Sequence, residues 1–79
     1  MTDIVFPALS TQRPDAEGVV TRWFVADGER VTTGQLVGEV QVDKVDAEVD
    51  APADGVLRQV VAVDGVARQG EVIGRVDVA

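Results

Sequence analysis

The stretch that decides the fold is Leu36-Val37-Gly38-Glu39-Val40-Gln41-Val42-Asp43-Lys44-Val45-Asp46-Ala47-Glu48-Val49-Asp50. Apolar and polar side chains alternate on both sides of Asp43 and Lys44, and alternation with a period of two is typical of half-buried β-strands. We therefore predict two strands, 36–42 and 45–50, joined by a tight turn. Lys44 is the only lysine in the chain, and this turn would hold its amine in water at a fixed place. The pattern favours an attachment point.

The alternation also assigns a face to each side chain of this hairpin. Val42 and Val45 flank the tip and should pair across the strands, bracing the turn. Asp43-Lys44 lacks the glycine that two-residue hairpin loops favour, so we expect a type I turn, which tolerates Asp43 at its first central position. The predicted inward residues are Gly38, Val40, Val42, Val45, Ala47 and Val49, and the predicted outward residues are Glu39, Gln41, Asp46, Glu48 and Asp50.

An internal repeat extends the argument to the whole chain. Gly18-Val19-Val20 matches Gly55-Val56-Leu57 at an offset of 37, and the run 34–40 matches 70–76 at an offset of 36. Two copies of one β-unit, neither able to bury its apolar face alone, should pack around a pseudo-two-fold axis. We predict an all-β fold, a flattened barrel or sandwich (a barrel-sandwich hybrid) of two antiparallel, mostly four-stranded sheets. All eight glycines fall into matched pairs: Gly18/Gly55, Gly28/Gly65, Gly34/Gly70 and Gly38/Gly74.

Short alternating runs between turn residues predict the remaining strands. They are 4–6, 18–25, 30–31, 56–63, 67–68 and 71–78, with an exposed loop at 8–17 and almost no helix. The repeat equates the strand that enters the Lys44 turn with the last strand of the chain. The lysine tip and the chain termini should therefore lie on opposite sides of the domain.

Composition excludes several classes of function. The 79 residues make one domain, 1–79, and the chain has no histidine and no cysteine, which removes the commonest general base and metal ligands. We expect no catalytic residue and no metal site, since the hairpin carboxylates form a solvated stripe. Trp23 should pack in or beside the core. A net charge of −7 disfavours nucleic acid and anionic membranes as partners. We expect a monomeric domain in the cytoplasm, or in the mitochondrial matrix if the source is eukaryotic.

Two interpretations of Lys44 compete on the residues alone. It is either an attachment point or an ordinary solvated lysine that offsets the neighbouring carboxylates. In the second case the chain would be an unmodified all-β module that binds a protein partner through its acidic face.

Motifs along the whole chain resemble the lipoyl domains of 2-oxo acid dehydrogenase acyltransferases. They are Phe6-Pro7-Ala8-Leu9-Ser10, Glu17-Gly18-Val19-Val20 with Trp23, Asp27-Gly28-Glu29-Arg30-Val31, Gly34 to Val40, Asp43-Lys44, Glu48 to Pro52 and Asp54-Gly55. The family's central signature is Glu-Thr-Asp-Lys-Ala; Asp43 and Lys44 match it, whereas Gln41, Val42 and Val45 replace its Glu, Thr and Ala. The related biotinyl domains carry Ala-Met-Lys-Met, so Asp43 favours a lipoyl over a biotinyl domain.

The resemblance implies a covalent cofactor carrier that is not itself an enzyme. Lipoic acid would be amide-linked to Lys44 by a lipoate ligase or lipoyl transferase that recognises Asp43. The arm would carry acyl groups and electrons among a 2-oxo acid decarboxylase, an acyltransferase and a dihydrolipoyl dehydrogenase. The family also implies that the loop after the first strand, here Leu9 to Glu17, contacts the decarboxylase. The alternative within the family is a biotinyl carrier domain of a carboxylase.

Overall fold

The strands occupy most of the chain. The computed structural model describes residues 2–9, 13 and 16–78. In this part of the chain no helix is long and apolar enough to cross a bilayer. The strands are β1 (Thr2–Val5), β2 (Glu17–Trp23), β3 (Arg30–Val31), β4 (Leu36–Val42), β5 (Val45–Asp50), β6 (Gly55–Gln59), β7 (Val66–Arg68) and β8 (Val72–Asp77).

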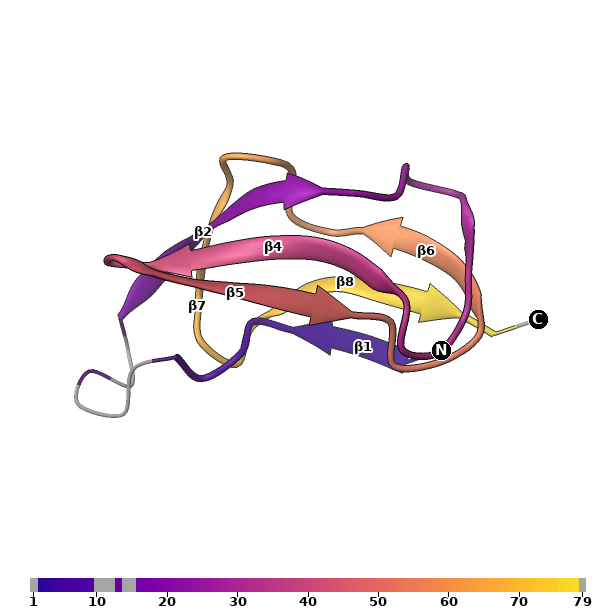
Figure 1. Ribbon diagram of the computed structural model, residues 1–79, viewed down its shortest axis with the longest axis horizontal. Coiled ribbons are helices and arrows are strands. Elements are labelled where there is room, and N and C mark those ends of the chain that lie inside the picture. The colour runs from indigo at the N-terminus through magenta and orange to yellow at the C-terminus, as the bar shows by residue number, and fades with distance from the viewer. Residues whose placement is uncertain (1, 10–12, 14–15, 79) are drawn as a thin grey trace.

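Two four-stranded sheets form the fold, in the orders β1-β8-β6-β3 and β5-β4-β2-β7. Every neighbouring pair is antiparallel. Exchanging β4 with β8, β2 with β6, β5 with β1 and β7 with β3 converts one order into the other. The predicted all-β architecture of two sheets related by a pseudo-two-fold axis is confirmed, and Figure 1 shows the sheets as two layers.

The repeat extends to individual backbone hydrogen bonds. The N–H of Gly34 donates to the carbonyl of Ala51, and the N–H of the matched Gly70 donates to the carbonyl of Phe6, both at 2.8 Å. Gly34 and Gly70 have φ angles of 85° and 89°, in the left-handed region where glycine avoids the strain of a Cβ atom. The two copies therefore share their turn geometry at this position.

Repeat-related side chains also fill the core. Four pairs occupy equivalent buried positions: Val20/Leu57, Val31/Ala67, Val37/Ile73 and Val40/Val76. Each sheet thus contributes one apolar face to a shared core, as neither unit could bury its face alone. The complete buried set is Ile4, Phe6, Ala16, Val20, Val25, Val31, Val37, Val40, Val42, Val49, Ala51, Leu57, Ala67, Ile73 and Val76.

Trp23 packs against a matched pair of glycines, one from each sheet. A Cβ atom added to Gly38 or to Gly74 would lie 3.1 Å from the Trp23 ring in each case. The indole N–H donates to the carbonyl of Val61 at 2.9 Å. The half-buried packing predicted for Trp23 is confirmed, and the ring spans the two sheets at a point where both glycines leave room for it.

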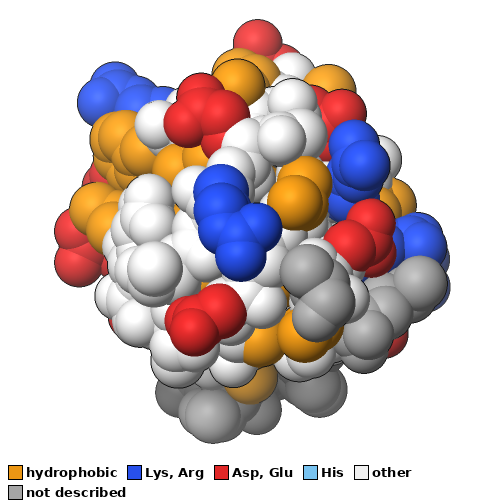
Figure 2. All heavy atoms as spheres, turned by 90° about the vertical axis from the view of Figure 1, so that its right-hand side faces the viewer, with side chains coloured by type: hydrophobic (Ala, Val, Ile, Leu, Met, Phe, Trp, Pro, Cys, Tyr) orange, Lys and Arg blue, Asp and Glu red, His pale blue; other side chains and the backbone are white. Residues whose placement is uncertain are grey.

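The hairpin tip and the chain ends lie at opposite extremes of the long axis. In Figure 1 the turn between β4 and β5 is on the left, whereas β1 begins and β8 ends on the right. Viewed from that right-hand end, acidic, basic and apolar side chains are interspersed, and none forms a continuous field (Figure 2). The predicted separation of the lysine tip from the termini is confirmed.

One predicted strand is too long. The run 56–63 was expected to be a single strand, but β6 ends at Gln59. The N–H groups of Val60 and Val61 both converge on the carbonyl of Ile73 at 3.0 Å, which bends the chain away from the ladder. The β-branched residues that follow predicted an extended backbone, but Val60 and Val63 are each 48% exposed on the outer side of this bend.

Candidate functional site

The hairpin that carries Lys44 is the longest paired segment of the fold. β4 and β5 are in register from Gly38↔Val49 to Val42↔Val45, so the loop between them is the two-residue segment Asp43-Lys44. The bounds predicted for both strands are confirmed, as is the pairing of Val42 with Val45. Because the two arms are hydrogen-bonded up to the tip, the position of Lys44 is fixed by the sheet and not by a flexible loop.

The turn is not of type I, contrary to the prediction. Asp43 has a φ of 53°, whereas type I requires about −60° at this position. Two-residue hairpin loops need a positive φ so that the turn matches the right-handed twist of its strands. Aspartate enters the left-handed region more readily than most residues because its short side chain bonds locally. Asp43 supplies this conformation in place of glycine.

Val45 is not buried, although it pairs with Val42 on the same face of the hairpin. It was predicted to point inward with Ala47 and Val49, but its side chain is 51% exposed, whereas Val42 across the ladder is only 2% exposed. Val42 is covered by the Phe6 ring, since an added Cβ on Gly18 would touch both. β5 is an edge strand with no neighbour on its other side. Val45, at the tip end of this edge strand, is therefore left open to solvent.

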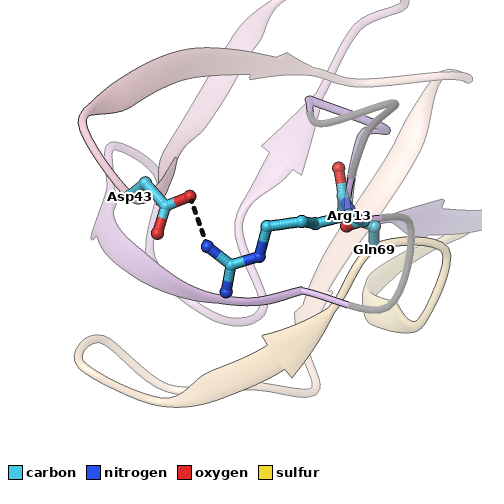
Figure 3. Close-up of polar contacts among 3 residues, drawn as sticks. All are labelled: Arg13, Asp43 and Gln69. Carbon is cyan, nitrogen blue, oxygen red and sulfur yellow. Dashed lines mark hydrogen bonds and ion pairs between the residues drawn. The ribbon is translucent and has the colours of Figure 1, made fainter.

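Lys44 is exposed to solvent at the tip. No hydrogen bond or ion pair joins its ammonium group to any of the residues that the structure describes. The carboxylate of its neighbour Asp43 pairs with a different cation. The Asp43 carboxylate accepts an ion-paired hydrogen bond from Arg13, with 3.3 Å between Nη1 and Oδ2 (Figure 3).

Arg13 comes from the chain segment that links β1 to β2. Its carbonyl oxygen accepts hydrogen bonds from the Gln69 side chain at 3.0 Å and from the Ala16 N–H at 2.9 Å. The arginine carbonyl is thus held by two hydrogen bonds, and the side chain reaches from there to the hairpin (Figure 3). The sequence alone indicates no role for Arg13, because an arginine in a polar segment carries no signal until the fold brings it beside the tip.

The other predicted contact surface is described only in part. Of the segment Leu9 to Glu17, residues 10–12, 14 and 15 lie outside the described residues. Leu9 packs against the core cluster and Ala16 is buried. The described ends of this segment are therefore anchored, and Arg13 between them contacts the tip.

The remaining acidic and concave features lie apart from Lys44. In the described part of the chain no three carboxylates gather closely enough to hold a metal ion. A shallow groove runs between the edge strands β1 and β5 and is lined by Asp3, Ile4, Val5, Pro7, Glu48, Val49, Asp50 and Pro52. Neither tip residue lines this groove.

Comparisons with known proteins agree with the geometry. A biotin–lipoyl family model described as "Biotin-requiring enzyme" matches residues 2–76. A dihydrolipoyllysine-residue succinyltransferase component of the 2-oxoglutarate dehydrogenase complex, from Rickettsia felis, is 32% identical over 75 residues. That alignment covers 94% of this chain and 18% of the relative.

Two further likenesses come from a curated protein and a solved structure. The pyruvate dehydrogenase complex protein X component of Chaetomium thermophilum is 35% identical over 63 residues, covering 80% of this chain and 14% of the relative. The solution structure of the lipoyl domain of the Azotobacter vinelandii 2-oxoglutarate dehydrogenase complex superposes with a TM-score of 0.74 at 33% identity. It covers 98% of this chain and 96% of that domain. The chain therefore spans under a fifth of the two curated relatives but nearly all of the lipoyl domain.

Proposed function

This chain belongs to the family of biotin- and lipoyl-attachment domains, as a lipoyl domain of the kind found in dihydrolipoyllysine acyltransferase components, and we propose that it carries lipoic acid on Lys44. The observation that supports this site is the placement of the chain's single lysine. Its amine stands exposed at a rigid two-residue turn, without a partner among the described residues, at the end of the domain remote from the termini.

The residues at the tip fit an amide-linked group. Modification requires the Lys44 ammonium to lose a proton, after which the Nζ lone pair attacks an activated lipoyl carboxyl carbon. The new C–N bond forms as the bond from that carbon to its activating group breaks, and the activating group departs with the bonding electron pair. An amine held away from carboxylates can approach a second protein's active site without first breaking an ion pair.

Asp43 is proposed as the residue that the lipoylating enzyme recognises beside the lysine. It is exposed and is fixed in the left-handed region by the turn. Gln41, Val42 and Val45 occupy the positions that depart from the family signature. Val42 is buried, Gln41 is half-buried, and Val45 is exposed. Of these three, Val45 offers the most side-chain surface for an approaching enzyme to contact.

The protein's part in the carrier function is presentation. When bound, the dithiolane of lipoic acid would supply a redox-active sulfur pair that can also hold an acyl group, which fits a chain without cysteine. The domain would hold the arm clear of its surface and, tethered in a complex, raise its effective concentration at successive active sites. We propose as partners a 2-oxo acid decarboxylase, an acyltransferase and a dihydrolipoyl dehydrogenase, since the named relatives are components of such complexes.

Intact mass spectrometry after incubation with a lipoate ligase, lipoate and ATP tests the attachment. We expect one lipoyl mass on the wild type and none on Lys44→Arg. Trypsin gives a second readout, because an amide on Lys44 blocks cleavage there and joins residues 31–58 in one peptide. Unmodified wild-type protein after complete turnover of a control lipoyl domain would refute the proposal.

Two alternatives predict different outcomes in the same assay. A biotinyl carrier would gain a biotin mass with a biotin ligase and no lipoyl mass. An unmodified interaction module would gain neither, and its binding to a protein partner would not depend on Lys44. The similar acyltransferase components and the superposed lipoyl domain favour lipoylation over both.

A further inference from the structure

The Asp43 carboxylate has two cations within reach, and the structure shows which one it contacts. Lys44 is adjacent to it in the chain, and Arg13 lies 30 residues away in sequence. The carboxylate is paired with the Arg13 guanidinium at 3.3 Å, and no ion pair joins it to Lys44. In the described residues the tip therefore holds a paired aspartate next to an ammonium group without a partner.

Arg13 is well placed to hold the carboxylate in this way. Its backbone oxygen is fixed by Gln69, which precedes β8, and by Ala16, which is 6% exposed. The side chain therefore reaches the tip from an anchored base, which reduces the entropy lost when the ion pair forms. A guanidinium is planar and always charged, so it is a constant cationic partner for the carboxylate.

We propose that Arg13 is a positioning residue for the modification of Lys44. By holding the Asp43 carboxylate on the side of the loop, it leaves the neighbouring ammonium unpaired and fixes the two tip residues in the relation that a lipoylating enzyme meets. This inference rests on the proposed function, because it concerns the efficiency of that same modification.

The expected effect on lipoylation follows from the solvent exposure of the Arg13–Asp43 ion pair. The side chains of Arg13 and Asp43 are 65% and 59% exposed, and exposed ion pairs are weak. Loss of the pair should change the kcat/KM of lipoylation by about two- to fivefold. It should leave the fold intact, since neither side chain belongs to the core. Raising the ionic strength should shrink the difference by screening the pair.

The test is lipoylation kinetics with a purified lipoate ligase on the wild type and five variants of the 79-residue chain. Arg13→Gln removes the positive charge of the side chain, whereas Arg13→Lys keeps a positive charge on a side chain of different shape. Arg58→Gln is the matched control, because Arg58 makes a similar exposed pair with Asp77 at 3.2 Å near the chain terminus. Asp43→Asn, alone and combined with Arg13→Gln, completes a double-mutant cycle.

We expect Arg13→Gln to raise the KM for the domain with kcat within about twofold, Arg13→Lys to recover most of the loss, and Arg58→Gln to match the wild type. In the Asp43→Asn background, Arg13→Gln should have no further effect. Equal KM values for wild type and Arg13→Gln, or an equal loss in both Asp43 backgrounds, would overturn the role of Arg13. A wild type that accepts no lipoyl group refutes the proposed function instead, so the two failures are distinct.

Discussion

Replacing Trp23 with phenylalanine removes the part of the ring that lies between the two sheets. The indole N–H bond to the Val61 carbonyl is lost, which costs about 0.5–1.5 kcal/mol. The missing carbons that packed against Gly38 and Gly74 cost about 1–2 kcal/mol more, at about 0.8 kcal/mol for each buried methylene equivalent. We therefore expect a loss of about 2–3 kcal/mol in the free energy of unfolding.

Circular dichroism in guanidinium measures this loss, because the variant no longer has a tryptophan to report by fluorescence. For 79 residues an unfolding entropy of about 2.1 cal/mol/K per residue converts the loss to a fall of about 12–18 °C in Tm. Phe24→Leu is the control, since Phe24 is 45% exposed and stacks only under Arg22; it should cost at most about 1 kcal/mol.

Gly74→Ala tests the same contact from the side of the glycine. Its new Cβ would lie 3.1 Å from the Trp23 ring, so it should destabilise the wild type more than the Trp23→Phe protein, where that ring atom is gone. A Trp23→Phe loss below about 1 kcal/mol, or an equal cost of Gly74→Ala in both backgrounds, would refute the idea that Trp23 joins the sheets.

Three further predictions concern the tip, the core and acid stability. Val42→Thr should cost about 1–3 kcal/mol by burying a hydroxyl, whereas Val45→Thr should cost less than about 0.5 kcal/mol; similar urea midpoints for the two would contradict their assigned exposures. Gly18→Ala would place a Cβ in steric conflict with the Phe6 ring and should cost about 3 kcal/mol, so a Tm close to that of the wild type would mean that the ring moves aside freely. Hydrogen bonds from the Thr33 backbone and hydroxyl lower the pKa of Asp54 below its ordinary value of 3.8. The stability they contribute is present above that value and is lost as the pH falls through the lower pKa of the folded state. Thr33→Val should therefore lose stability at pH values well above 3.8 but approach the wild type in strong acid, and a constant difference in urea unfolding across that range would be evidence against it.

The sequence was most informative where two signals coincided. The bounds of β4 and β5 could be predicted because alternation with a period of two is clear there and Asp43-Lys44 interrupts it. The two-sheet arrangement followed from the matched glycines, whose positions reflect backbone geometry in both copies. The repeat did not extend to every turn: the positive φ lies on Gly28 in the first copy but on Asp64 in the second.

Other features required the tertiary structure. Val45 has the same local pattern as Val49, but it is 51% exposed at the tip of the hairpin whereas Val49 is 6% exposed. β6 stops at Gln59 because two successive N–H groups share one carbonyl, and valine-rich sequence gives no sign of that bend. Arg13 contacts Asp43 across 30 residues of sequence, and this contact depends on the tertiary structure. Lys44 could be predicted as a candidate site from its uniqueness and the turn, and that assignment stays a prediction.

The pseudo-two-fold axis relates two strand pairs, β4 with β5 and β8 with β1. A tight turn joins the strands of the first pair. β8 and β1 pair as β4 and β5 do, yet no tight turn joins them, because β1 is the first strand of the fold and β8 the last. A symmetric dimer of the half-length unit would present two tips, one at each end. In this chain the two halves are joined, and the β4–β5 pair is the one closed by the Asp43-Lys44 turn. The proposed stoichiometry of one arm per domain follows from this asymmetry.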